Sequence, residues 1–453
     1  MGTDTLTYFP TRSRSRARIA YLFGALGGIL FGYDSGVIAG ALLFIRKDMV
    51  LSPQLQGMVV GGLLLGAMVG AFGTGRFAER FGPRKMLIVA GSMFIVTSVL
   101  SALAPNPLSL IAARVLIGIT IGVSTVQVPL YMSEISPKHI RGGLSSLNQL
   151  AIATGILISY VVCYLLSAHG QWRWMLGLAA VPSIFLTIGM IFQPDSPRWL
   201  VRQGRVQEAR RVLEITNTPE DAAEALREIE GTNKQGSKVR LIDVLKSRAL
   251  RPTVIAVFGL AVLQQALGIN TIVYYAPTIL RAAGFGESTA LLNSVGLGVL
   301  SIIMTIFAAR VVDRLGRRPL LVGGSIVMGL SMATLGCVFH FGGPATAMGS
   351  MVAVGALAVF KAAFSFSWGP LVWVMMPELL PMRIRARTMS AAAFSMFVMN
   401  FIVASTFPVL LEMGVESAFG TFSVCCFGAT LFAIYCLRET AGLSLEEIEK
   451  GTC

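Results

Sequence analysis

The chain has 453 residues and a formal net charge of +14, with 54% hydrophobic residues and only 13% charged ones. Its mean hydropathy is +0.72. A soluble protein of this length cannot cover its surface with so few charges. The composition therefore excludes a soluble globular protein and indicates an all-α membrane protein.

The apolar residues fall into runs of about 20 or more, long enough to cross a bilayer as helices. We predict twelve spanning helices, at 18–44, 56–78, 84–104, 108–133, 142–167, 173–192, 253–280, 288–310, 319–340, 349–376, 384–411 and 417–437. The predicted organisation is a cytoplasmic tail (1–17), a six-helix bundle (18–195), an intracellular helical linker (196–251), a second six-helix bundle (252–437) and a cytoplasmic tail (438–453).

The distribution of Lys and Arg explains the positive net charge. When the N-terminus is placed in the cytoplasm, most basic residues fall on cytoplasmic segments, as the positive-inside rule requires. We therefore expect both termini in the cytoplasm, contact with the lipid bilayer and no nucleic-acid partner. Arg12 to Arg18 precede the first apolar run without a small-residue cleavage pattern, so this run is predicted to remain as a span.

A charged segment between apolar runs occurs twice. Residues 75–85 (GRFAERFGPRK) return as 309–319 (ARVVDRLGRRP), and 132–141 (MSEISPKHIR) return as 376–385 (MPELLPMRIR). The repeat spans about half the chain, which indicates two related halves. Opposite charges at helix ends can pair and form a cytoplasmic gate; the candidate gate residues are Glu79, Arg80, Arg84, Glu134, Arg141, Asp313, Arg314, Glu378 and Arg385. The alternative is that they only mark cytoplasmic loops.

Signatures of enzymes and metal sites are missing from the sequence. Residues 73–78 match a dinucleotide fingerprint, but at the end of an apolar helix rather than after a strand. The six cysteines have neither metal-ligand nor redox spacing. We expect no enzymatic activity, no cofactor and no metal.

Three ionisable residues lie within predicted spans: Asp34, Arg114 and Lys361. A charge at the bilayer centre costs at least about 2.5–3.5 kcal/mol, so it indicates function by default. Asp34 and Arg114 lie at similar depths, roughly 12 Å and 9 Å from the outer ends of their helices, and are predicted to pair. A carboxylate in that position can carry a proton; a purely structural ion pair is the alternative. Lys361 could be a counter-ion, a substrate contact or a structural lysine.

These features resemble the major facilitator superfamily and, within it, the sugar porter family. The resemblance covers nearly the whole chain and rests on the duplicated segment and on motifs in the family's order: Pro129-Leu-Tyr131 with Glu134, Pro194-Asp-Ser-Pro-Arg-Trp-Leu200, Gln264-Gln265 with Gly268-Ile-Asn270, and Arg438-Glu-Thr440 with Gly442. It implies two six-helix bundles that move a sugar by alternating access. It also implies that Asp34 and Arg114 couple transport to a proton.

The resemblance further implies the sugar-binding residues, which are neutral amides and aromatic side chains suited to hydroxyl groups and ring faces: Gln149, Gln264, Gln265, Asn270, Tyr274 and Trp373. Asn400, one turn after Met396 and Phe397, is a further candidate. The alternative is that the amides only hold helices together. Pro277 and Gly369-Pro370 can break their helices and free backbone groups to line a cavity.

The chain departs from the family pattern at Ser301, where asparagine is frequent, at Met396 and Phe397, and at Pro83. We expect a monomeric plasma-membrane symporter of a hexose or pentose, in a bacterial inner membrane. A facilitative uniporter, a polyol or cyclitol symporter and a non-transporting sugar sensor are the alternatives.

Overall fold

The computed structural model describes residues 11–135, 141–216, 219–234, 250–341, 346–380 and 382–439, and the described residues form helices without strands. The helices of the first half are α1 (Thr11–Met49), α2 (Pro53–Phe81), α3 (Pro83–Ala102), α4 (Pro107–Ile135), α5 (Arg141–Leu166), η2 (Ser167–His169), α6 (Trp172–Gly177) and α7 (Ala180–Ile191). The linker contributes α8 (Pro197–Arg202), α9 (Val206–Thr216) and α10 (Pro219–Lys234).

The second half contains α12 (Arg251–Ala266), α13 (Ile269–Ala282), α14 (Glu287–Leu315), α15 (Arg317–His340), α16 (Ala347–Phe366), α17 (Trp368–Leu379), α18 (Met382–Met413) and α19 (Val415–Cys436). Twelve segments of the described chain are long and apolar enough to cross a membrane. This number confirms the prediction, with α6 and α7, α12 and α13, and α16 and α17 each forming one span.

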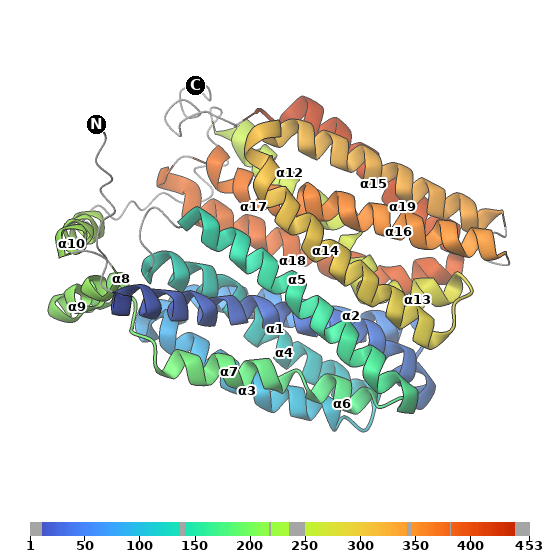
Figure 1. Cartoon of the computed structure of the whole chain (residues 1–453), viewed down its shortest axis with the longest axis horizontal. Helices are drawn as coiled ribbons and strands as arrows, with labels where there is room; N and C mark the ends of the chain where they lie inside the picture. Colours follow the sequence, from blue (N-terminus) through green and yellow to red (C-terminus); the bar gives the residue numbers. More distant parts are fainter. Residues whose placement is uncertain are drawn as a thin grey trace.

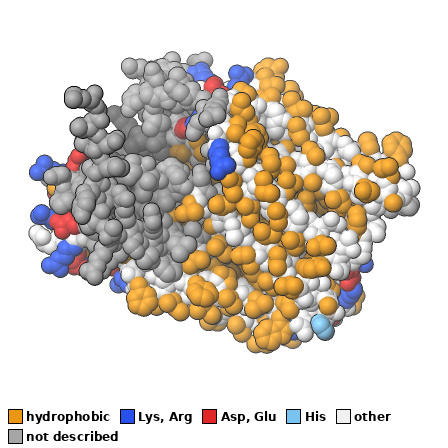
Figure 2. Space-filling view, in the orientation of Figure 1, with side chains coloured by type: hydrophobic (Ala, Val, Ile, Leu, Met, Phe, Trp, Pro, Cys, Tyr) orange, Lys and Arg blue, Asp and Glu red, His pale blue; other side chains and the backbone are white. Residues whose placement is uncertain are grey.

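The two halves lie side by side, with α9 and α10 projecting at one end (Figure 1). We call this the linker end; the opposite far end carries the turns after α1, α5 and α13. Many large apolar side chains, among them Phe72, Phe185 and Val424, are exposed. Apolar side chains cover much of the described surface seen in Figure 2, while charged side chains lie mostly toward its margins. Such a belt fits a multi-pass membrane protein.

Small residues set the closest helix contacts inside the first half. Gly66 of α2 and Gly118 of α4 face each other, and a side chain at either position would collide with the backbone of the opposite helix. Close packing of this kind is the main source of helix association in lipid, where there is no hydrophobic driving force between helices.

The seventh span breaks at Gly268 rather than at Pro277. Gly268 has φ of 85°, a left-handed conformation that separates α12 from α13, and α13 then continues through Pro277. A proline leaves the carbonyl of the residue four positions earlier without its helical donor. Here that carbonyl belongs to Val273 and accepts a hydrogen bond of 2.8 Å from the Tyr160 hydroxyl of α5. The freed backbone group is satisfied by the other half, so the helix need not break.

The same arrangement recurs within the second half. Pro408 lies inside α18, and the carbonyl of Ala404, four residues earlier, accepts a hydrogen bond of 3.0 Å from Tyr275. The tenth span breaks at Ser367, directly before Trp368, so Gly369 and Pro370 lie in the first turn of α17. The predicted break near these two residues is therefore confirmed.

The halves make contact toward the far end. α2 packs against α18, and α5 packs against α14. Lys47 at the end of α1 forms an ion pair of 2.7 Å with Glu287 at the start of α14, and Arg281 pairs with the same carboxylate at 3.0 Å. Together with the hydrogen bond from Tyr160 to Val273, these contacts close the far end.

Candidate functional site

Asp34 of α1 and Arg114 of α4 form a buried ion pair. The Asp34 Oδ1 and Arg114 Nη1 atoms are 2.6 Å apart, and both side chains are 1% exposed. Arg114 Nε also donates to the carbonyl of Val59 in α2 at 3.4 Å. The predicted pairing is confirmed. Asp34 Oδ2 and Arg114 Nη2 have no hydrogen-bond partner in the described part of the chain, which leaves the carboxylate one oxygen for a proton or a water molecule.

A chain of amides lies at the break of the seventh span. Gln264 Nε2 donates to the carbonyl of Trp368 at 2.9 Å, Gln265 Nε2 donates to Gln264 Oε1 at 3.1 Å, and Asn270 Nδ2 donates to Gln265 Oε1 at 2.5 Å. Gln264 and Gln265 are buried. Because Gly268 turns the backbone between them and Asn270, side chains of α12 and α13 meet at one place and also join α17.

Tyr274 connects this chain to the rest of the site. It lies one turn after Asn270 on α13, and its hydroxyl accepts a hydrogen bond of 3.4 Å from Asn400 Nδ2 of α18. Asn400 Oδ1 is buried without a partner among the described residues. Tyr274 is also within electrostatic range of Asp34 and Arg114, and α13 packs against α1. It therefore stands between the charged pair of one half and the amides of the other.

The remaining predicted sugar-binding residues, Gln149 and Trp373, are less buried than the two glutamines of the seventh span. Gln149 of α5 is half-buried and forms no hydrogen bond within the described chain. Trp373 of α17 is 39% exposed, so its ring has a free surface. Met396 and Phe397 are buried apolar residues of α18, one turn before Asn400.

Comparison with known proteins identifies the family. The family model described as "Sugar (and other) transporter" matches residues 20–451. The chain is 45% identical over 441 residues to the probable metabolite transport protein CsbC of Bacillus subtilis, covering 96% of this chain and 94% of that one. The protein is a sugar porter of the major facilitator superfamily.

A second relative and a solved structure extend the comparison of this sugar porter. The galactose–proton symporter of Escherichia coli K12 is 37% identical over 430 residues, which cover 94% of this chain and 92% of the relative. A partially occluded inward open structure of the E. coli xylose transporter XylE superposes with a TM-score of 0.83 at 28% identity, covering 95% of this chain and all of that one. These similarities establish a transporter and not an enzyme.

The candidate gate residues of the transporter contact their own halves. Arg84 donates to the carbonyls of Met190 at 3.1 Å and Ile191 at 2.5 Å, and Glu134 accepts a short hydrogen bond from Ser196. Arg317 pairs with Glu378 at 3.7 Å. The Glu79 carbonyl accepts from Trp199 and Gln203 of the linker, while the Glu79 and Arg80 side chains are exposed.

The side chains of Arg141, Asp313, Arg314 and Arg385 lie outside what the structure describes. The hypothesis that the gate charges pair across the two halves therefore stays a prediction. Among the described contacts, Arg84 and Glu134 hold the segment from Met190 to Ser196 to the first half.

Lys361 of α16 is 6% exposed and forms neither a hydrogen bond nor an ion pair with the described residues. One turn later, Ser365 Oγ is 2.9 Å from Ser301 Oγ of α14. Ser301, the position where the family frequently has asparagine, is thus engaged with a serine that sequence reasoning overlooked. The four-residue spacing from Lys361 to Ser365 was the available signal.

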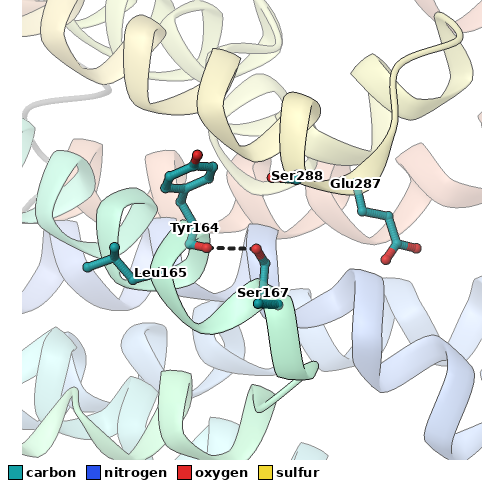
Figure 3. Close-up of a pocket in the computed structure, with 6 residues that line it drawn as sticks. Tyr164, Leu165, Ser167, Glu287 and Ser288 are labelled. Atoms are coloured by element: carbon teal, nitrogen blue, oxygen red, sulfur yellow. Dashed lines mark hydrogen bonds between the residues drawn. The ribbon is translucent and has the colours of Figure 1, made fainter.

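A cavity of about 490 Å³ lies at the far end, between α5 and η2 on one side and the start of α14 on the other (Figure 3). It is lined by Tyr164, Leu165, Ser167, Ala168, Glu287 and Ser288, and Ser167 Oγ donates to the Tyr164 carbonyl at 2.6 Å. The predicted substrate residues do not line it. This cavity belongs to the contact between the halves rather than to the amide site.

Proposed function

We propose that this transporter imports a hexose or pentose together with a proton by alternating access. The observation that carries the proposal is the Tyr274 position: it lies within electrostatic range of Asp34 and Arg114, and one turn after Asn270 of the amide chain. Proton site and sugar site would thus share one residue at the surface between the halves.

The charged pair supplies the proton site. Protonation of Asp34 would cancel its charge, weaken the bond to Arg114 and change how the first half meets α13. A ligand shifts a conformational equilibrium only by its different affinity for the two states. Asp34 pairs with Arg114 of its own half and lies on α1, which packs against α13 of the other half. The free energy of its charged form can therefore differ between the two conformational states.

The amides supply the sugar site. Gln264, Gln265, Asn270 and Asn400 offer donors and acceptors without net charge, which suits a polyhydroxylated neutral ligand. The exposed Trp373 ring offers an apolar face for sugar C–H groups. The E. coli relative whose name states galactose–proton symport supports the same assignment.

We further propose that the linker end faces the cytoplasm of a bacterium, that both termini lie there and that the protein acts as a monomer in the inner membrane. Support comes from the placement of Lys and Arg. In that orientation the contacts at the far end would close the outer side, which supports an inward-facing state.

The decisive experiment is uptake of labelled xylose, glucose, galactose and arabinose into proteoliposomes of the purified protein, with and without an imposed pH gradient. We expect uphill accumulation of at least one sugar when the outside is acidic and its loss on adding a protonophore. Uptake that ignores the gradient would indicate a uniporter. Binding without uptake would indicate a sensor, and uptake of inositol but none of these sugars would indicate a cyclitol symporter.

A further inference from the structure

Lys361 is the ionisable residue that the charged pair leaves unexplained. Asp34 and Arg114 offset each other, whereas the Lys361 side chain is 6% exposed on a spanning helix and has neither a hydrogen bond nor a counter-ion among the described residues. Buried polar groups are almost always hydrogen-bonded, so an unpartnered cation in this position requires a partner from elsewhere.

Lys361 lies at the depth of the amide site. Lys361 is fourteen residues after the first residue of α16, and Ser301 is fourteen residues after the first residue of α14. Gly268 is fourteen residues before the last residue of α13. At 1.5 Å per residue, each lies about 21 Å from the far end. The start of α16 and the end of α13 lie close together, since Ser350 Oγ of α16 donates a hydrogen bond of 2.7 Å to the carbonyl of Ala283, the residue directly after α13.

Lys361 also lies on the face of α16 that meets α14. Residues four apart lie on one helix face, and Ser365 of that face meets Ser301 of α14. α16 packs against both α13 and α14. The two serine hydroxyls satisfy each other, so neither replaces the amide that the family frequently has at position 301.

We propose that Lys361 binds the substrate directly and determines specificity: its ammonium donates a hydrogen bond to one hydroxyl oxygen of a neutral monosaccharide. This inference rests on the proposed function and adds a residue to its sugar site. An ammonium offers three donors and accepts none. A charge-assisted hydrogen bond from the ammonium increases the affinity for a sugar with a hydroxyl at one ring position. A deoxy sugar without that hydroxyl leaves the cation unpaired and binds more weakly.

The test is a scan of monodeoxy sugars against wild type, Lys361→Met and Lys361→Gln. Counterflow of the best transported sugar in proteoliposomes is competed with each monodeoxy analogue in turn. In wild type, we expect one analogue to compete at least about 10- to 100-fold more weakly than the parent sugar. Lys361→Met should bind the parent more weakly by a similar factor and lose discrimination at that one position only.

Lys361→Gln keeps a hydrogen-bond donor without the charge, so it should discriminate against that analogue more than Lys361→Met does and less than wild type. It also provides the test if Lys361→Met folds poorly. Lys85→Met, the same change at an exposed position of α3, is the control. Unchanged discrimination at every position in both variants would overturn the inference while the proposed function stands. Stronger competition by glucuronate than by any neutral sugar would also overturn it. If wild type moves no monosaccharide, the proposed function itself fails.

Discussion

The interior of each half and the surface between the halves use polar groups differently. Inside a half, polar contacts are buried, as between Gln264 and Gln265 and between Tyr275 and Ala404. Between the halves, the ion pair of Lys47 and Glu287 is partly exposed. A protein that separates its halves in each cycle must keep the first kind intact and exchange the second kind.

The difference has an energetic basis. Removing one partner of a buried ion pair typically costs about 3–5 kcal/mol, whereas an exposed pair is worth about 1 kcal/mol or less. Contacts inside a half are therefore too strong to break during turnover, unless a proton neutralises one partner, as proposed for Asp34. Contacts between halves are weak enough to break and still bias the balance between two states.

The largest expected effect follows from Asp34→Asn. The amide keeps the shape but cannot gain or lose a proton, so sugar accumulation driven by a pH gradient should disappear entirely while counterflow exchange continues. Uptake and counterflow in the same proteoliposomes measure this. Asp48→Asn on the same helix is the control, since Asp48 accepts from Trp172 Nε1 at 2.7 Å at the far end. Persistent accumulation in Asp34→Asn would exclude Asp34 as the proton carrier.

A smaller effect is expected from Gln265→Leu, which removes the middle of the amide chain. Loss of a sugar contact together with an unpaired Asn270 should raise the sugar concentration for half-maximal uptake about 10- to 100-fold. The accumulation ratio at saturating sugar should remain. Gln56→Leu changes a buried amide that bonds only the nearby Leu51 carbonyl, and should leave both quantities unchanged. Equal effects of the two variants would contradict the assignment.

Tyr160→Phe and Tyr275→Phe compare the two kinds of contact directly. Each removes a hydroxyl from a carbonyl that a proline has freed, but the Tyr160 bond crosses between the halves and the Tyr275 bond stays inside one. An unsatisfied buried carbonyl costs about 1–3 kcal/mol, so Tyr160→Phe should shift the conformational balance about 5- to 150-fold toward an open far end. Tyr275→Phe should instead lower thermal stability.

Leu291 of α14 is buried at the far end against Gly40 of α1. Labelling of a cysteine introduced at Leu291 by an impermeant thiol reagent, in a background without native cysteines, therefore reports opening of the far end. Faster labelling in Tyr160→Phe than in Tyr275→Phe is the expected result. Equal labelling rates would show that the Tyr160 bond does not hold the halves together.

The smallest effect is expected from Glu287→Gln. Lys47 is 57% exposed and Glu287 27% exposed, so their loss should change the half-saturation constant for external sugar by less than about fivefold. The change should vanish at high salt, which screens such pairs. Glu214→Gln in the linker breaks an exposed pair of 2.9 Å with Arg210 and is the control. An effect that does not depend on salt would contradict an electrostatic contribution of the Lys47–Glu287 pair to closing the far end.

The sequence alone predicted what depends on local composition and length. Twelve spans followed from apolar runs, because every residue facing lipid must be apolar over the bilayer thickness. The pairing of Asp34 with Arg114 also followed, because two opposite charges at equal depth have few other partners in an apolar interior. The division into two related halves followed from the repeated charged segment, because a duplicated sequence indicates a duplicated unit.

Only the tertiary structure decided how backbone and side chains from different helices satisfy one another. Pro277 does not break its helix because Tyr160, over a hundred residues away, donates to the carbonyl it frees. Ser301 bonds Ser365, and Lys361 finds no partner among the described residues, for reasons that lie in the neighbouring helices. The sequence shows that a proline frees a carbonyl and that a serine or a lysine brings a hydrogen-bonding group. Which group pairs with it depends on how the helices pack.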